Sequence, residues 1–282
     1  MNAREYAEEA SDIFVLSDSF IRIKELLEDD SATIDDISEV ILLDPALTAA
    51  ILKLSNSSFF NYSGKIDTIS KAMLVLGITE VYNLVIAYFT GKAFTKLEAD
   101  GDFLDAFWYS TIDCALLVKY LASFTRIKKV ERLFVLGLLH NIGELVVQQL
   151  TPEKIALCQS NGLDDLPWQK QQQVLGFTFG ECSAEVLRFW RLPYCLIEPV
   201  GSQDQADFEY LSDESKLLYV AKRAMLANSL YQENNLDQEN SIEQLVSQAQ
   251  LDELGLSYQN IESAYDFLST ERDSVSSLLK HK

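Results

Sequence analysis

The residues of this 282-residue chain that are suited to hydrolytic chemistry gather around one histidine, in the stretch LGLLHNIGEL at residues 136–145. The chain has two histidines, and the other, His281, is next to last. Asn141 follows His140, and Glu144 lies one helical turn further along the same face. An imidazole and a carboxylate on one face can ligate a metal ion that activates water. His140 is therefore a ligand of a metal centre, the remnant of such a centre, or a histidine of the core.

The cysteines offer no second reactive centre. The chain has four, none in a CxxC pair and all among apolar neighbours: Cys114, Cys158, Cys182 and Cys195. We expect reduced core thiols and neither a disulfide nor a zinc site. Cysteine–histidine catalysis would have to use His140, because His281 stands at a terminus, and no cysteine carries a nucleophile motif.

Composition restricts the class of partner. Hydrophobic residues make up 48% of the chain, which predicts a folded protein with a real core. The formal net charge of −20 repels phosphate backbones and anionic lipid, so we expect neither nucleic acid nor a membrane surface as a partner. The acidic N-terminal sequence lacks the apolar segment of a signal peptide, and polar residues interrupt the apolar runs. These features predict a cytoplasmic protein.

The elements that position His140 are predicted to be helices throughout. Apolar residues recur with the helical period, and period-two alternation is scarce. Thr33 and Asp36 have the spacing of a capping box, and Asp44 followed by Pro45 is typical of a helix start. Further helices are expected from about Thr68 to Leu76 with Gly77 at its end, from a cap at Thr79, from Thr151-Pro152, and over 166–176, 180–190, 213–231, 241–253 and 257–269.

The helix that carries His140 is expected to begin near Lys129 and to lie in the middle of a bundle. It is apolar almost all round from Leu133 to Val147, which leaves no face for solvent. We expect residues 1–212 to form one helical domain and residues 213–282 to form an extension packed on it. The stripe of the extension that must be covered, by this domain or by a partner, is Leu217, Val220, Ala221, Ala224 and Leu230.

Several motifs stand in a fixed order between about residues 15 and 210. Asp-Pro-Ala-Leu at 44–47 leads to Leu-x-x-x-Asn-Ser at 52–57, and Leu-Gly at 76–77 ends an apolar helix. FVLGLLHNIGEL at 134–145 and VLGFTFGECSAEVLRFWRLP at 174–193 follow. In this order the motifs resemble the HD-related output domain (HDOD) family, a bacterial signalling module related to the HD superfamily of metal-dependent phosphohydrolases. The resemblance implies an HD-superfamily-like multi-helix bundle, to which the last helices are an addition.

The same resemblance implies that most metal ligands of the catalytic relatives are lost. Their His-Asp pair reads His140-Asn141 here, and their Trp-x-His-Ser pattern has Tyr109 in place of its histidine. Phe179 replaces the histidine of a Gly-Phe-x-His segment. A histidine pair that often follows the Leu-Pro aligns with Gln203 and Asp204. With two nearby carboxylates added, the expected vestigial pocket contains Tyr109, Asp113, His140, Asn141, Glu144, Phe179, Gln203 and Asp204.

Two interpretations of this pocket stay open. The first is a rebuilt magnesium or manganese site with Asp113, His140, Glu144 and Asp204 as ligands. The second is a remnant in which His140 is buried and hydrogen-bonded. An amide at position 141 cannot bridge two cations as a carboxylate can, so we favour the remnant. We accordingly expect no catalytic residue, no bound metal and no cofactor.

The predicted function is binding without catalysis. The resemblance and the missing ligands favour a signalling or regulatory protein that binds a protein partner or a small regulator. The alternative is a divergent metal-dependent HD-type phosphohydrolase that uses the rebuilt site. A nucleotide receptor is disfavoured because the pocket lacks Arg or Lys for phosphates. The basic residues before the central helix, Arg126, Lys128 and Lys129, are interpreted as a solvated helix start.

Two surfaces are candidates for a partner. Phe59, Phe60 and Tyr62 cluster in the loop SSFFNYSGK, where aromatic side chains can anchor a partner or fold over the bundle as a lid, and we favour the lid. About fifteen residues precede the HDOD-like region, so an input signal would come from a separate protein or through the C-terminal helices. The sequence gives no signal for an oligomeric state.

Overall fold

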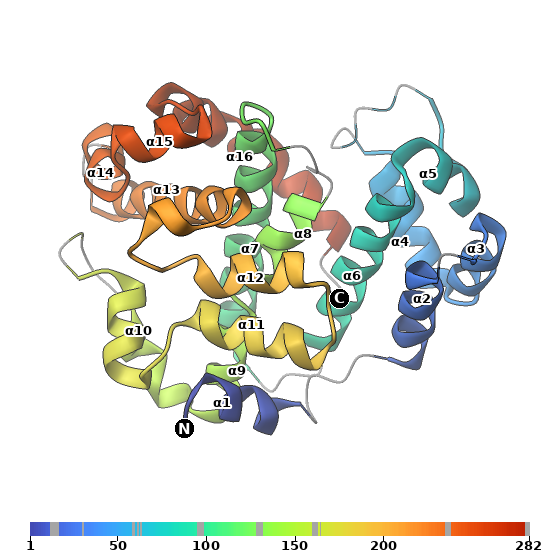
Figure 1. The fold of residues 1–282 in the computed structure, drawn as a ribbon, viewed down its shortest axis with the longest axis horizontal. Coiled ribbons are helices and arrows are strands. Elements are labelled where there is room, and N and C mark those ends of the chain that lie inside the picture. Colours follow the sequence, from blue (N-terminus) through green and yellow to red (C-terminus); the bar gives the residue numbers. More distant parts are fainter. Residues whose placement is uncertain are drawn as a thin grey trace. The chain divides into compact units, whose positions relative to one another are not determined.

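The computed structural model describes residues 1–11, 17–29, 31–57, 60, 62, 64–94, 99–127, 132–159, 163, 165–234 and 238–279. In these ranges all regular structure is helical, which confirms the all-α prediction (Figure 1). Contacts within the chain divide it into two compact units. Unit 1 is Met1–Asp12 with Glu98–Thr270, and unit 2 is Ile13–Leu97 with Glu271–Lys282.

Unit 2 contains five consecutive helices, in blue to teal in Figure 1: α2 (Asp18–Glu28), α3 (Ile34–Leu42), α4 (Pro45–Ser55), α5 (Ile69–Leu76) and α6 (Ile78–Phe94). The capping box at the start of α3 is confirmed, since Thr33 and Asp36 exchange backbone-to-side-chain hydrogen bonds. The carboxylate of Asp44 accepts hydrogen bonds of 3.0 Å from the backbone of Ala46 and Leu47, as predicted for the start of α4.

The end of α5 corrects one predicted boundary. Gly77 has a φ of +95°, a conformation that glycine adopts without strain, and it ends α5 as expected. The next helix, α6, begins at Ile78, so Thr79 lies inside it and is not its cap. The turn made by Gly77 leaves no room for the separate capping residue that the sequence pattern predicted.

A side-chain amide closes the connection between α4 and α5. Asn56 donates from Nδ2 to the carbonyl of Ile66 at 2.6 Å and accepts from the backbone N–H of Ile66 at 2.8 Å. Of the three loop aromatics, Phe59 lies outside the described residues and Phe60 is half-buried. Tyr62 is 40% exposed, and its ring packs so closely on Gly64 that a Cβ atom there would lie 2.6 Å from Cε1.

Unit 1 contains α1, the helices from α7 onward and most of α16. The α-helices are α1 (Ala3–Ala10), α7 (Gly101–Ala122), α8 (Leu133–Leu139), α9 (Ile142–Leu150), α10 (Pro167–Leu175), α11 (Phe179–Phe189), α12 (Tyr194–Ser202), α13 (Asp213–Asn234), α14 (Gln238–Leu245), α15 (Gln248–Leu254) and α16 (Tyr258–Leu279). Short 3₁₀ turns, η3 (Pro152–Lys154), η4 (Ala156–Cys158) and η5 (Phe208–Tyr210), join them. The helix expected from Thr151-Pro152 is therefore wrong, since η3 and η4 stand there.

The central segment is two helices and not one. The expected continuous helix ends at Leu139, and α9 begins at Ile142 after a break at His140 and Asn141. Its expected start near Lys129 lies outside the described residues. The stretch Leu133–Leu150 has a mean hydropathy of 1.4, enough by composition for a membrane span, but 72% of it is buried inside the fold. This burial is typical of a core element and agrees with the predicted central position.

Glycines let the central helices touch their neighbours backbone to backbone. A Cβ atom at Gly137 would lie 2.4 Å from Cα of Ala115 on α7. A Cβ atom at Gly143 would lie 2.2 Å from the carbonyl oxygen of Phe179 on α11, and the Gly143 N–H donates to Ser183 at 2.8 Å. Helices α8 and α9 are thus fixed between α7 and α11.

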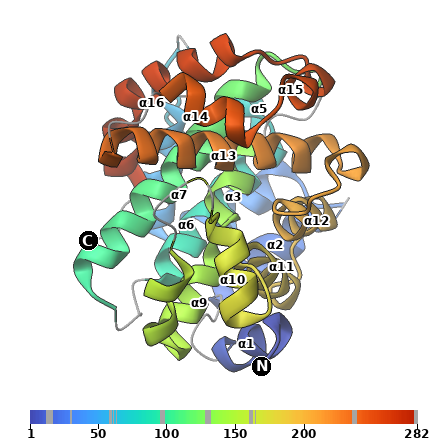
Figure 2. The same ribbon diagram turned by 90° about the vertical axis from the view of Figure 1, so that its left-hand side faces the viewer.

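The predicted stripe of the extension lies on α13 and is buried. Leu217, Val220, Ala221 and Ala224 are fully buried, and Leu230 is 2% exposed. Helix α13 packs on α7, α8 and α12 and also contacts α14 and α15 (Figure 2). The helix expected over 241–253 is instead α14 and α15, because Ser247 caps a new helix inside that range. The boundary expected at residue 212 stays a prediction.

Candidate functional site

His140 lies at the break between α8 and α9 and is 3% exposed. Its Nδ1 atom is 2.7 Å from the carbonyl oxygen of Gly137. A carbonyl can only accept, so Nδ1 carries the proton and donates, which leaves the lone pair on Nε2. Burial lowers the pKa of His140 to about 4, and the charge of Lys222 adds to the effect. His140 is therefore a neutral imidazole at neutral pH.

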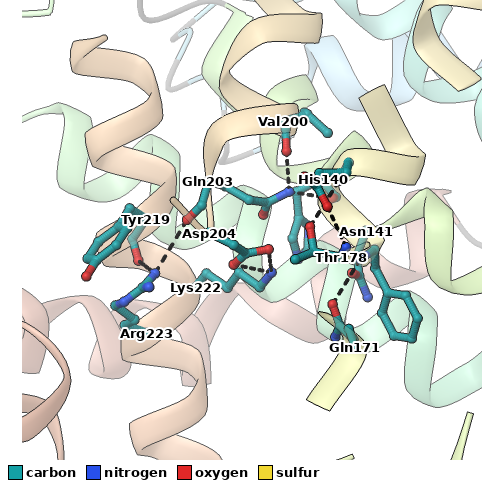
Figure 3. A network of polar contacts seen from close by, with 12 residues as sticks. His140, Asn141, Gln171, Thr178, Val200, Gln203, Asp204, Tyr219, Lys222 and Arg223 are labelled. Carbon is teal, nitrogen blue, oxygen red and sulfur yellow. Dashed lines mark hydrogen bonds and ion pairs between the residues drawn. The ribbon is translucent and has the colours of Figure 1, made fainter. Parts of the chain in front are cut away.

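The side chain of Gln203 holds the break in place (Figure 3). This residue ends α12 and is fully buried. Its Nε2 atom donates to the carbonyl of His140 at 2.8 Å and to that of Val200 at 2.7 Å. Its Oε1 atom is buried and has no hydrogen-bond partner among the described residues. An acceptor buried in this way is costly unless a donor reaches it.

Asn141 and Glu144 interact with each other at the start of α9. The amide of Asn141 donates a hydrogen bond to the Glu144 carboxylate. Burial raises the pKa of Glu144 to about 7, although the charge of Lys222 and the Asn141 hydrogen bond both act to lower it. The carboxylate is thus partly protonated near neutral pH.

A lysine that no sequence motif indicated lies beside these residues. The ammonium of Lys222, on α13, is 2.8 Å from each carboxylate oxygen of Asp204 (Figure 3). The two side chains are 11% and 5% exposed. Lys222 also lies over the ring of Trp168, 5.5 Å from its centroid. We call His140, Glu144, Gln203, Asp204 and Lys222 the His140 cluster.

Arg223, the next residue on α13, is a second buried cation that was not predicted. Its guanidinium lies over the rings of Trp168 and Tyr219, and its Nη1 atom donates to the carbonyls of Gln203 and Tyr219 at 3.4 and 3.3 Å. Burial lowers the pKa of Arg223 to about 10. A Lys-Arg pair inside an amphipathic helix usually indicates a solvent-facing position, so only the depth of α13 in the fold could have identified it.

The other residues predicted for this site lie on α7 and at the start of α11. Tyr109, on α7, is 39% exposed. Asp113, one turn further along α7, is half-buried and acts electrostatically on Cys114, as Lys222 also does. Phe179 is buried at the start of α11, where its backbone packs on Gly143. A phenyl ring there offers no metal ligand.

The geometry offers little to a metal ion. Among the described residues, no three His, Cys, Asp or Glu side chains are placed to hold one. The oxygens of Asp204 are taken by Lys222, and Asn141 binds one oxygen of Glu144. Hydrolytic metal sites need several converging ligands and an open position for water. The donor set around His140 does not meet that requirement.

A groove of about 490 Å³ lies elsewhere in unit 1 and includes none of the predicted site residues. It is lined by parts of α1, α11 and α12, among them Asn2, Glu185, Tyr194 and Glu198. The carboxylate of Glu198 accepts hydrogen bonds from Ser212 and Ser215 at the start of α13, at 2.8 and 3.0 Å. These contacts fix the beginning of α13 against α12.

Known proteins share this architecture. One solved structure is of a candidate signal transduction protein from Marinobacter aquaeolei VT8. It has a TM-score of 0.71 at 22% identity, and the match covers 97% of this chain and 61% of the Marinobacter chain. An HDOD domain protein of unknown function from Geobacter sulfurreducens has a TM-score of 0.69 at 18% identity, over 98% and 97% of the two chains. A candidate phosphohydrolase from Shewanella amazonensis SB2B has a TM-score of 0.64 at 23% identity, over 92% and 97%. At these identities the likeness concerns the fold.

The sequence comparisons agree with that fold. An uncharacterized protein of Treponema pallidum (strain Nichols) is 25% identical over 201 residues, or 70% of this chain. The chain spans 39% of the length of that relative. The HDOD domain profile matches residues 13–206, a range that contains the capped helices of unit 2, the His140 break and Asp204. The chain therefore belongs to the HDOD family.

Proposed function

We propose that this protein is a non-catalytic signalling or regulatory protein of the bacterial cytoplasm that acts by binding a protein partner through its HDOD domain. The observation that carries the proposal is the state of the His140 cluster. The chain's own groups occupy the acceptors that a metal would need, because Lys222 binds both oxygens of Asp204.

The alternative is a divergent metal-dependent phosphohydrolase that uses Asp113, His140, Glu144 and Asp204. Two solved structures of the same fold are of proteins named as candidate phosphohydrolases. The alternative requires Lys222 to leave Asp204 and Asn141 to leave Glu144, and both movements would break buried polar contacts. We therefore prefer the binding role.

Measurements of metal content and of phosphoester hydrolysis together distinguish the binding role from the phosphohydrolase. The purified full-length chain is expected to contain no stoichiometric metal, and to hydrolyse neither phosphomonoesters nor phosphodiesters with Mg²⁺ or Mn²⁺. His140→Gln serves as the matched variant, and its background turnover is expected to equal that of the wild type. Metal-dependent turnover that disappears in His140→Gln would overturn the binding role in favour of the enzyme.

We further propose that residues 213–282 work as an extension packed on the HDOD domain and not as a free docking arm. The burial of the α13 stripe supports this arrangement. A chain truncated near Ser212 would lose Lys222 and expose the surface that α13 covers, so partner capture is better done with the full-length protein. Capture from the host bacterium with wild type and Tyr62→Ser tests the loop aromatics, and unchanged capture by Tyr62→Ser would assign binding to another surface.

A further inference from the structure

We infer that the His140 cluster is a binding site for a primary ammonium group, and that the chain fills this site itself with Lys222. The acceptors around the cation are the first support. Around the Lys222 ammonium lie the two oxygens of Asp204, each 2.8 Å away. The ring of Trp168 lies 5.5 Å from the cation, within the range of a cation–π contact, and Arg223 lies over the same ring at 4.2 Å.

A further acceptor in the cluster remains without a donor. Gln203 is fully buried, and its Nε2 atom is committed to two carbonyl groups, which fixes the orientation of the amide. Its Oε1 atom is therefore an acceptor, and no described donor reaches it. The lone pair of His140 Nε2 is a second neutral acceptor in the same cluster. The Lys222 ammonium thus contacts the Asp204 carboxylate and the Trp168 ring, and it leaves the neutral acceptors of the cluster unused. A carboxylate and an aromatic ring together are suited to a small N–H donor cation.

The cation comes from outside the part of the chain that matches the HDOD profile. Asp204, Gln203 and His140 lie within the matched residues 13–206, whereas Lys222 and the rest of α13 lie beyond them. The extension thus delivers Lys222, beside Arg223, into the HDOD fold. Lys222 is both the ligand of this site and one of the contacts that hold α13 there.

Another lysine of α13 provides a close control. Lys216 binds Glu253 at 2.7 Å, is 12% exposed, and lies over the ring of Phe208 at 5.5 Å. It resembles Lys222 in helix, burial, ion pair and aromatic contact. It differs in that the carboxylate of Glu253 is 40% exposed and Lys216 lies outside the His140 cluster.

Chemical rescue tests the inference on the full-length chain. Lys222→Ala is expected to lower the thermal midpoint, and methylammonium chloride to raise it again in a saturable manner, by about 2–4 °C for one restored interaction. Sodium chloride and tetramethylammonium chloride at the same ionic strength are expected to give no such rise, because neither offers N–H donors. Lys216→Ala and the wild type are expected not to respond. Equal responses of Lys222→Ala and Lys216→Ala, or no response, would overturn the inference.

A second measurement serves if Lys222→Ala does not fold. Lys222→Met keeps the side-chain volume and removes the charge. In this variant the NMR titration of His140 is expected to show a higher pKa than in the wild type, because the Lys222 charge disfavours the imidazolium. Lys216→Met is expected to leave the His140 titration unchanged. An unchanged His140 pKa in Lys222→Met, or manganese binding to the wild type at Asp204, would contradict an internal cation at this position.

Discussion

Both carboxylate oxygens of Asp204 accept hydrogen bonds from the ammonium of Lys222, and the two side chains are almost fully buried. Removal of one partner leaves the other charge buried and unpaired, which costs about 3–5 kcal/mol. Lys222→Met or Asp204→Leu is therefore expected to lower the free energy of unfolding by about 3 kcal/mol in urea titrations. The double variant is expected to recover most of this loss, since no charge is left unpaired.

The matched control for the Lys222 and Asp204 variants is Lys216→Met. Its partner Glu253 is 40% exposed, so the charge that remains stays hydrated, and the expected loss is about 0–1 kcal/mol. A loss in Lys216→Met as large as that in Lys222→Met would show that the apolar stem of the lysine, and not the buried pair, carries the effect.

The pKa of His140 predicts a loss of stability in acid. Burial lowers the pKa in the folded state to about 4, from 6.5 in an exposed histidine. Between these values the unfolded chain binds the proton and the folded chain does not, so stability falls as the pH drops from 6.5 to 4. The full effect is on the order of 3 kcal/mol. Relative to the wild type, His140→Gln should become steadily more stable over this range in urea titrations, and parallel curves would contradict the prediction.

The pKa of Glu144 predicts the opposite slope. Burial raises it to about 7 in the folded state, from 4.5. Between these values the folded chain keeps a proton that the unfolded chain has released, so stability falls as the pH rises from 4.5 to 7. The glutamine in Glu144→Gln is neutral at every pH. The free energy of unfolding of this variant should therefore rise relative to that of the wild type as the pH increases over this range. Because the contributions of His140 and Glu144 have opposite signs, the wild type should vary less between pH 4.5 and 6.5 than either variant.

Close backbone contacts predict which glycines cannot be replaced. Gly143→Ala forces a methyl group to 2.2 Å from the Phe179 carbonyl, so α9 and α11 must separate, and overpacking of this kind costs about 1–3 kcal/mol. Gly101→Ala is the control, because nothing lies within 4 Å of its Cβ position and alanine favours the helix. Thermal unfolding should show a lower midpoint for Gly143→Ala and an equal or higher one for Gly101→Ala.

Local signals in the sequence predicted the helices well. Thr33 with Asp36, Asp44 with Pro45, and Gly77 act within one turn of the chain, and the structure has each as expected. The break at His140 was missed because every residue on both sides is compatible with a helix. At the interruption the His140 carbonyl accepts a hydrogen bond from Gln203, sixty-three residues further along the chain, which no local pattern indicates.

The candidate site was predictable only in its HDOD part. The motifs placed His140 and Asp204, and the structure has both beside one cation. Lys222 could not be assigned, because the same residue on the outer face of α13 would give the same sequence pattern. Tertiary packing decides whether a lysine faces a carboxylate or water. In this protein the packing is that of α13 on α12 and α7.

The hydrogen bond from Gln203 to the His140 carbonyl has a mechanical consequence. The two halves of the central segment meet at a joint that is held from outside by Gln203, the residue that caps the C-terminus of α12. A force that displaces α12 along its axis would pull on this joint and change the angle between α8 and α9. Gln203 thus links α12 to this joint, and Glu198 of the same helix accepts hydrogen bonds from the start of α13. A displacement of α13 would accordingly be passed through α12 to the joint at His140 and would change the angle between α8 and α9. This change would need no ligand at the His140 cluster.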